Sequence, residues 1–279
     1  MKESILTLFD RAAVDRRRVG LTVIRTFDSS LSVAAVSDLI SRHRTPGVTE
    51  AGDFIVKHRC ATDVKDWMCG VESDPVSGLR GGYAEAINTL AANLFGAPSH
   101  RLKAHARSAF SGRTWCVFER LSGIHSLASL IESPRGTLVD AKTFTRVTAS
   151  LAAALQSGLF HADTNASNLF LDDRGDVKLI DYEVAVHFSA AIGRGLALQF
   201  SKMWDWRLKR AFDYQQFCDI VRSQLLAYSE PAGLEREFGR FVYYSETRTN
   251  RARRQERLQE ASGGNPDYLA KMKSLLAVR

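Results

Sequence analysis

The sequence predicts an α+β fold, with its strands concentrated in the first 120 residues and mostly helices after them. Residues 19–27, 53–60 and 113–121 are rich in β-branched and aromatic residues, which is typical of strands. Between the second and third, residues 83–95 repeat apolar side chains at helical spacing. Beyond Glu183 the apolar pattern is mostly helical, which places a helical half after a sheet-containing half.

The N-terminal fifty residues have the least regular pattern. Residues 4–14 predict a short amphipathic helix, and residues 31–40 show mixed periodicity. Thr45-Pro46-Gly47 predicts a break in regular structure. Gly81-Gly82 precedes the helix at 83–95, which we expect to end at Gly96.

A second long helix and a hairpin follow in the C-terminal half. The helix is expected to begin at a cap on Asp140 and to stop at Gly158. Its predicted buried stripe consists of Phe144, Val147, Leu151 and Leu155. Residues 169–171 and 177–180 predict two short strands joined by a polar, glycine-containing turn.

Composition is that of an ordinary globular protein with a basic balance. The 279 residues are 45% hydrophobic and 25% charged, and the net charge is +7 with a pI near 9.4. An anionic partner is therefore expected: phosphate, a phosphorylated glycolipid, a membrane surface or nucleic acid. The sequence has neither zinc-finger spacing nor a basic platform interleaved with aromatics, which argues against nucleic acid.

Cysteine usage and hydropathy indicate a cytoplasmic protein. The four cysteines are Cys60, Cys69, Cys116 and Cys218, and their spacing makes neither a CxxC pair nor a metal cluster. That usage fits a reducing compartment. The apolar run at the N-terminus is too short for a signal peptide, and no run reaches the length of a spanning helix.

Residues 161–183 contain the strongest chemical signal in the chain. Asp163 follows the second long helix, Asn168 precedes one strand of the hairpin and Asp181 ends the other. The hairpin brings Asn168 and Asp181 back toward each other, so three oxygen-bearing side chains can gather at one point. Carboxylate and amide oxygens suit Mg²⁺, and a phosphate-transfer site also needs a carboxylate that orients a hydroxyl.

This segment resembles the catalytic core of the protein-kinase-like superfamily. His161-Ala162-Asp163 matches that family's His-x-Asp, Asn168 has the family spacing, and Asp181-Tyr182-Glu183 stands where the family has Asp-Phe-Gly. The His-Ala-Asp triplet and the Leu-Ile-Asp-Tyr strand end look most like bacterial sugar kinases of lipopolysaccharide core assembly, the Kdo and heptose kinases. The core motif covers under a tenth of the chain, and a weaker match extends over residues 54–228.

The resemblance implies two lobes. Residues 1–120 would form a small β-rich N-terminal lobe with one long helix, on the phosphate side of the nucleotide. Residues 121–279 would form a larger, mostly helical lobe that carries the catalytic loop, the metal site and the acceptor site. Asp163 would then be the catalytic residue that orients the acceptor hydroxyl, while Asn168 and Asp181 would bind Mg²⁺. His161 is expected to brace the loop.

The resemblance also implies an ATP site. The Ile-Val-Lys end of the strand at 53–60 resembles the Val-Ala-Ile-Lys strand of kinases, so Lys57 would reach the α- and β-phosphates. Glu85 is the expected partner of Lys57, with Glu72 as a competitor and a plain surface glutamate as the alternative.

The hinge between the lobes would contribute backbone contacts to ATP. The Glu119 carbonyl and the Leu121 amide would hydrogen-bond adenine, with Phe118 at the back of the pocket; the alternative is an ordinary core strand followed by a turn. The chain has no GxGxxG between its early elements, so the loop that covers the phosphates is not placed by the sequence.

Three departures from the family pattern bear on the substrate. Ala162 replaces the arginine that usually meets a phosphorylated activation loop, Tyr182-Glu183 replaces Phe-Gly, and no Ala-Pro-Glu follows. They favour a constitutive kinase that transfers the γ-phosphate of ATP to a sugar hydroxyl of a lipopolysaccharide-core-type glycolipid. The alternatives are a Ser/Thr protein kinase, an aminoglycoside-type small-molecule kinase, and a pseudokinase scaffold that binds nucleotide without turnover.

Two basic segments lie outside the motif. Residues 248–257 hold five arginines and one glutamate, and such a run can dock an enzyme on the cytoplasmic face of the inner membrane or form a solvated helix face. Residues 196–212 carry Trp204 and Trp206 among basic residues.

Overall fold

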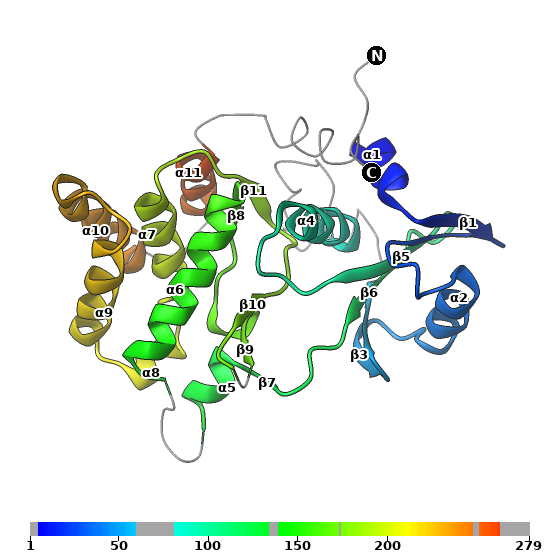
Figure 1. Cartoon of the computed structure of the whole chain (residues 1–279), viewed down its shortest axis with the longest axis horizontal. Coiled ribbons are helices and arrows are strands. Elements are labelled where there is room, and N and C mark those ends of the chain that lie inside the picture. Colours follow the sequence, from blue (N-terminus) through cyan, green and yellow to red (C-terminus); the bar gives the residue numbers. More distant parts are fainter. Residues whose placement is uncertain (1–4, 60–80, 134–138, 173, 248–250, 263–279) are drawn as a thin grey trace.

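The computed structural model describes residues 5–59, 81–133, 139–172, 174–247 and 251–262, and it divides into a sheet-containing part and a helical part (Figure 1). The first part contains a six-stranded antiparallel sheet with the order β1-β2-β5-β6-β4-β3. Its strands are β1 (Asp15–Val19), β2 (Thr22–Thr26), β3 (Gly47–Ala51), β4 (Phe54–Arg59), β5 (Leu102–Ser108) and β6 (Thr114–Glu119).

Two edge strands of this sheet were not predicted. The strand expected over residues 19–27 is present as β2, but it begins after a turn at Gly20, whose positive φ of 58° reverses the chain between β1 and β2. β1 reads Asp-Arg-Arg-Arg-Val, a charged sequence that suits an exposed edge and carries little strand signal of its own. β3 pairs with β4 on the opposite edge.

Helices cover both faces of the sheet. α2 (Val33–Arg42) packs on one face, where Val36 and Ile40 meet Trp115 and Val117 of β6 in one hydrophobic cluster. α1 (Ile5–Ala12) and α4 (Gly81–Phe95) share the opposite cluster. Since alternate residues of a strand point to opposite faces, Cys116 and Phe118 of the same strand belong to that opposite cluster.

α4 begins two residues earlier than the sequence pattern predicted. Gly81 and Gly82 are its first residues, and a Cβ on Gly82 would come within 2.3 Å of the Thr114 hydroxyl oxygen. The absence of a side chain therefore lets the helix start in contact with β6. This close approach also brings the Cys116 Sγ to 3.2 Å from the Gly82 carbonyl.

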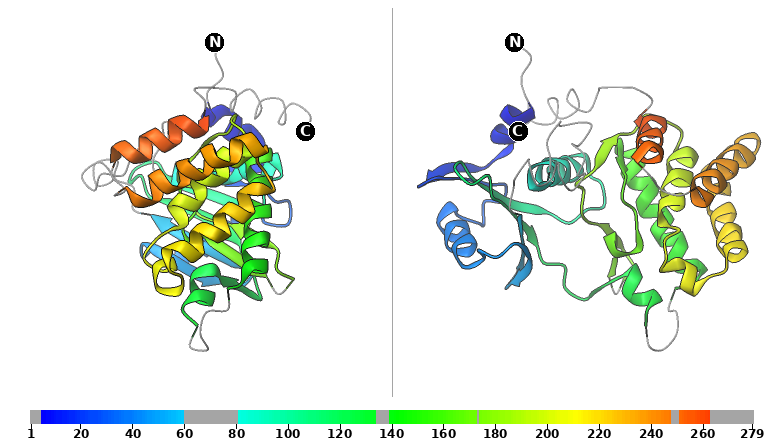
Figure 2. Two further views of the ribbon diagram at one scale, coloured as in Figure 1. Left: turned by 90° about the vertical axis from the view of Figure 1, so that its left-hand side faces the viewer. Right: turned by 180° about the vertical axis from the view of Figure 1, so that it is seen from behind.

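The second part is mostly helical. Its helices are α5 (Leu127–Ile131), α6 (Ala141–Gln156), α7 (Ile192–Met203), α8 (Leu208–Ala211), α9 (Tyr214–Leu226), α10 (Pro231–Glu246) and α11 (Arg251–Ser262). Figure 2 shows α6, α7, α9 and α10 packed side by side, in front of the strands in its left-hand view. Those strands, β7 (Ile124–Ser126), β8 (Leu159–His161), β9 (Leu169–Asp172), β10 (Val177–Leu179) and β11 (Ala185–His187), form the sheets β10-β9-β7 and β11-β8, and a short 3₁₀ turn, η1 (Ala166–Asn168), precedes β9.

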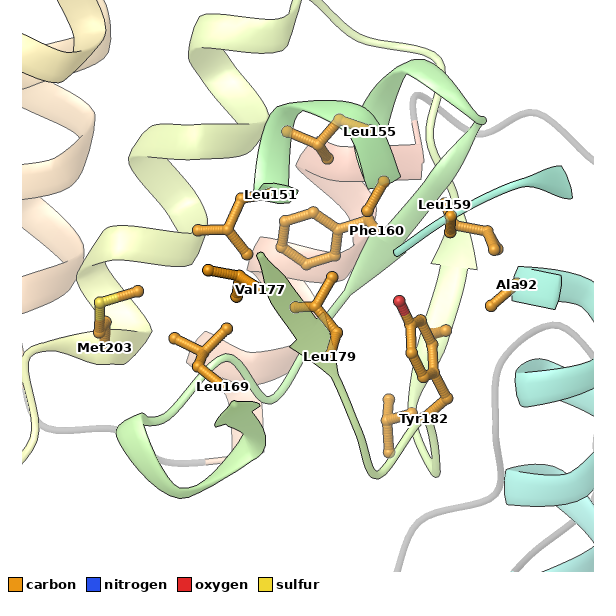
Figure 3. Packing of buried hydrophobic residues seen from close by; sticks show 14 of the residues in the cluster. Ala92, Leu151, Leu155, Leu159, Phe160, Leu169, Val177, Leu179, Tyr182 and Met203 are labelled. Carbon is orange, nitrogen blue, oxygen red and sulfur yellow. The ribbon is translucent and has the colours of Figure 1, made fainter. Parts of the chain in front are cut away.

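α6 and the β9–β10 hairpin agree with the sequence. The Asp140 carboxylate accepts a hydrogen bond from the Thr143 amide at 2.8 Å and caps α6, and Gly158 follows the helix with a φ of 90°. The predicted stripe on α6 is buried. Figure 3 shows Leu151 and Leu155 packed toward Phe160, with Val177 and Leu179 of β10 beside them.

One hydrophobic cluster joins the two parts of the molecule. It includes Ile87 and Ala92 of α4 together with Leu151 of α6 and Leu179 of β10. Figure 3 shows the Tyr182 ring between Leu179 and Ala92. The predicted α+β class, with a β-rich first part and a helical second part, is confirmed. Within the described residues no helix combines the length and the apolar character needed to cross a membrane.

Gly195 tests how tightly α7 packs. A Cβ at this position would lie 2.7 Å from both Leu155 methyl carbons and 2.8 Å from the Phe188 ring. We expect Gly195→Ala to lower the free energy of unfolding by about 1–3 kcal/mol because the packed core cannot accept the extra methyl group. Gly239→Ala in α10 is the matched control: its Cβ would meet nothing within 4 Å, so we expect a gain of up to about 1 kcal/mol. Urea unfolding of both variants measures the difference, and equal stabilities would contradict the packing.

Candidate active site

A cleft of about 560 Å³ lies between the six-stranded sheet and the β9–β10 hairpin. All five residues that the sequence assigned to nucleotide binding line it: Lys57, Glu85, Phe118, Glu119 and Leu121. Asp181 lines it from the opposite side. Glu85 and Asp181 lie 28 and 124 positions after Lys57 in the chain, yet both meet it in one cavity.

The Lys57 side chain bridges two carboxylates at the centre of this cleft. Its Nζ lies 2.8 Å from Glu85 Oε2 and 2.8 Å from Asp181 Oδ1. Glu85 projects from α4 and is only 1% exposed, so its carboxyl group has almost no contact with solvent. The structure thus brings Lys57 to Glu85, as predicted. The competitor Glu72 lies outside the described residues.

Burial and charge act in opposite directions on these three groups. Burial lowers the pKa of Lys57, but Glu85 and Asp181 outweigh it, and the net pKa is raised. Burial raises the pKa of Asp181, but Lys57 outweighs it and the net pKa is lowered. For Glu85 burial prevails over Lys57 and raises the pKa to about 7. Lys57 and Asp181 are therefore held in their charged forms, and Glu85 is the group on which burial costs most.

His161 braces the loop that carries Asp163. The Asp163 backbone N–H donates to His161 Nδ1 at 3.1 Å, so the imidazole proton is on Nε2, which donates to the Ile180 carbonyl at 2.8 Å. Burial lowers the pKa of His161, which keeps the ring neutral in this role. One histidine therefore ties the Asp163 loop to the strand end that bears Asp181.

Asp163 is held by groups on both sides. Asn168 Nδ2 donates to the Asp163 carbonyl at 2.9 Å, and Asn165 Nδ2 donates to its carboxylate at 3.2 Å. Lys202, from the last turn of α7, places its Nζ 2.9 Å from Asp163 Oδ1. Sequence reasoning missed Lys202, because it is 39 positions downstream on a helix whose pattern shows only an apolar stripe.

The donor set at Asn168 and Asp181 fits Mg²⁺. The Asn168 amide nitrogen donates to Asp163, so the amide oxygen is the side-chain atom that could meet a metal. The Ile180 N–H donates to the Asn168 carbonyl at 3.0 Å, which places Asn168 beside the strand end that leads into Asp181. One carboxylate and one amide oxygen are a suitable set for a metal that also takes water and phosphate oxygens. In the described part of the chain no three His, Cys, Asp or Glu side chains could hold a metal by themselves.

Asp181 has an unusual backbone conformation. Its φ is 61°, and among the described residues it is the one non-glycine with a positive φ. Such a conformation costs on the order of 1 kcal/mol or more and persists only where the surroundings impose it. Here the two neighbours are fixed: the Ile180 carbonyl by His161, and the Tyr182 carbonyl by Asn88 Nδ2 at 3.0 Å.

A second ion pair, which the sequence reasoning missed, lies next to Asp181. The Arg59 guanidinium donates to both Glu183 oxygens, at 3.1 and 2.6 Å, and lies 4.0 Å from Asp181 Oδ1. Arg59 follows Lys57 by two positions, so both point to the same face of β4. Glu183, which stands where the resemblance implies a glycine, is thus the partner of a second cation. Tyr182, the residue before it, is fully buried. The Lys-x-Arg spacing in a predicted strand could have indicated that Arg59 shares the face of Lys57.

The hinge and the edge strand complete the cleft. Phe118 is buried and stacks on His100 with ring centroids 4.1 Å apart. The Glu119 N–H donates to the Arg101 carbonyl at 3.0 Å, which leaves the Glu119 carbonyl as its backbone group for a ligand. Val48 and Glu50 of β3 also line the cleft, and Val48 pairs with Lys57. The edge strand β3 therefore forms part of the wall of the cleft.

No family model and no curated protein matches the chain. Among solved structures it is similar to WbdD bound to the kinase inhibitor LY294002, at 17% identity and a TM-score of 0.43, over 72% of this chain and 44% of that chain. It is also similar to the bifunctional kinase-methyltransferase WbdD (15%, 0.42, over 88% and 53%) and to monomeric WbdD (18%, 0.43, over 84% and 52%). This chain spans about half the length of those WbdD chains.

Glu85→Gln tests the electrostatics of the buried carboxyl. The folded protein holds the Glu85 proton more tightly than the unfolded chain does, because the pKa is raised from 4.5 to about 7. The carboxyl's contribution to stability is therefore present below pH 4.5 and is lost as the pH rises toward 7. We expect the wild-type unfolding free energy to fall with pH relative to Glu85→Gln across that window, by a few kcal/mol at most.

The control for this experiment is Glu50→Gln, which removes an exposed carboxylate paired with Arg120. Its pH dependence should follow that of the wild type. Chemical denaturation at a series of pH values measures all three proteins. Parallel curves for the wild type and Glu85→Gln would contradict the burial argument.

Proposed function

We propose that this protein is an ATP-dependent phosphotransferase that moves the γ-phosphate to a hydroxyl, and that the hydroxyl belongs to a sugar of a lipopolysaccharide-core-type glycolipid. One observation carries the proposal: Lys57 bridges Glu85 and Asp181 inside a cleft. Asp163 and Asn168 lie on the loop that His161 ties to the same strand end.

Lys57 would hold the α- and β-phosphates of ATP. Its ammonium already has a fixed direction because Glu85 anchors it from α4. Arg59 adds a second positive charge close to Asp181. Electrostatic stabilisation by positioned charges is the main contribution that a protein makes to phosphoryl transfer. Phe118, Glu119 and Leu121 would meet the adenine at the other end of the cleft.

Asp163 would orient the acceptor hydroxyl. In the reaction the acceptor oxygen forms a bond to the γ-phosphorus, the bond from that phosphorus to the β–γ bridging oxygen breaks, and ADP leaves. The hydroxyl proton goes to Asp163 late in this step. Burial raises the pKa of Asp163, but Lys202 and the other neighbours outweigh it and the net pKa is lowered. The carboxylate is therefore ready to accept the hydroxyl hydrogen bond.

Asn168 and Asp181 would hold Mg²⁺, which would neutralise phosphate charge. Asp181 suits this role because Lys57 keeps it ionised. Its release from Lys57 toward a metal needs only a change of partner within the cleft, since both groups line it.

The acceptor and the location are inferred from the charge of the chain. The net charge of +7 favours a polyanionic acceptor, and a glycolipid acceptor would place the enzyme at the cytoplasmic face of the inner membrane. The arginine run at 248–257 gives this little support. Arg253 pairs with Glu256 at 2.6 Å and Arg257 is buried. Residues 248–250 lie outside the described part.

Asp163→Asn tests the reaction. We expect the wild type to release ADP from Mg-ATP with lipopolysaccharide core acceptors, and the variant to be slower by about 10²–10⁴-fold because general-base assistance is lost. ATP binding, measured by calorimetry, should change little. The acceptor panel also includes proteins and aminoglycosides. ADP release with one of those alone would select an alternative kinase, and tight ATP binding without any turnover would overturn the proposal in favour of a scaffold.

Lys202→Met tests the partner of Asp163. We expect kcat to fall by about tenfold or more, with the KM for ATP little changed, because the ammonium that positions the carboxylate is gone. Lys202→Arg should recover part of the loss. Lys103→Met is the control, since it removes a comparable ion pair, with Asp28, outside the cleft. An unchanged kcat in Lys202→Met would exclude this role.

A further inference from the structure

The segment between α7 and α9 presents an aromatic side chain among positive charges. Trp206 is 53% exposed, one of the large apolar side chains that the core does not cover. The Cζ atoms of Arg207 and Arg210 lie 4.4 and 5.4 Å from its ring centroid. Lys209 and Arg210 are themselves exposed, and neither has a carboxylate partner in the described part of the chain.

This exposed indole sits on a fixed turn. The Asp205 carboxylate accepts from the Arg207 and Leu208 backbone N–H groups, at 2.8 and 3.3 Å. Leu208 is fully buried, and Trp204 stacks on Phe217 with ring centroids 4.9 Å apart. Both sides of the turn are therefore anchored in the core, so a ligand at Trp206 would not have to order the backbone.

The same segment begins at the candidate active site. Lys202, four positions before Trp206, contacts Asp163. Four Cα–Cα steps limit the separation of the two Cα atoms to about 15 Å. Arg207 also lies 3.5 Å from Glu132 at the end of α5, the first helix after the hinge. Figures 1 and 2 show α8 beside that end of α5 in each view. A ligand on Trp206 is thus within the span of a short oligosaccharide from Asp163.

We propose that Trp206, Lys209 and Arg210 form the acceptor-binding surface and that the acceptor is an anionic oligosaccharide. This inference rests on the proposed function, because it assigns the side from which the hydroxyl reaches Asp163. One sugar ring packs against the exposed part of the Trp206 side chain, and a phosphate or carboxylate of the glycan binds Arg210 and Lys209. The Arg207 and Arg210 guanidinium groups lie over the Trp206 ring and the Lys209 ammonium lies over the Trp204 ring, so apolar surface and anion donors occur in one place.

The charge distribution favours an anionic glycan over a neutral one. Residues 206–210 carry three cations and no acid. Arg207 is engaged by Glu132 and Asp205, so Lys209 and Arg210 are the pair left for a ligand. A guanidinium can donate two parallel hydrogen bonds to phosphate or carboxylate oxygens, whereas a neutral sugar would leave the charges of Lys209 and Arg210 without an anionic partner.

The test uses the full chain with delipidated, phosphorylated lipopolysaccharide core oligosaccharide. We expect Trp206→Ala and Arg210→Met each to raise the acceptor KM by about tenfold, while kcat and the KM for ATP stay within about twofold. Phe110→Ala, which removes an aromatic ring 88% exposed in the sheet-containing part, is the matched control and should change nothing.

Calorimetric binding without turnover separates this inference from the proposed function. Tight binding of the oligosaccharide by the wild type, weakened in Trp206→Ala, supports the surface even if no ADP is released. Turnover with an acceptor KM unchanged in both variants overturns it. Equal binding of the dephosphorylated oligosaccharide overturns the anionic class. Binding only to phosphatidylglycerol vesicles shows a membrane-docking face and overturns it too.

Discussion

The ammonium group of Lys57 is the constraint on which the arrangement of the cleft depends. It is shared by a carboxylate from α4 and a carboxylate from the end of β10, so one charge fixes the relative positions of a strand, a helix and a hairpin. Burying the Glu85 carboxylate is unfavourable, but the buried carboxyl group fixes the direction of the Lys57 side chain. Removing the ammonium would leave two carboxylates facing each other, with Arg59 within 4.0 Å of both.

The Arg59–Glu183 pair fixes the segment that follows Asp181. Where the resemblance implies Phe-Gly, the buried Tyr182 packs against His161 and its carbonyl is held by Asn88. Glu183 is then tied to the strand that bears Lys57. These contacts hold the residues on both sides of Asp181 in place.

Sequence reasoning succeeded where local patterns and topology agree. The cap at Asp140, the stripe on α6 and the hairpin after Asn168 all carry their own signals, and they place Asp163, Asn168 and Asp181 together. It failed for β1 and β3, whose strand character comes from pairing with neighbours. It also missed Lys202 and Arg59, since a lone basic residue acquires meaning only when a distant carboxylate lies beside it.

The shared hydrophobic cluster has a consequence for motion. Ala92 and Ile87 of the sheet-containing part lie in the same apolar body as Leu151 and Leu179 of the helical part, with the Tyr182 ring between them. Separating the two parts completely would expose these apolar side chains to water, which is unfavourable. A ligand is therefore expected to enter and leave through small movements of β3 at the rim of the cleft, without wide separation of the two parts. The two parts are also expected to unfold together in one cooperative thermal transition.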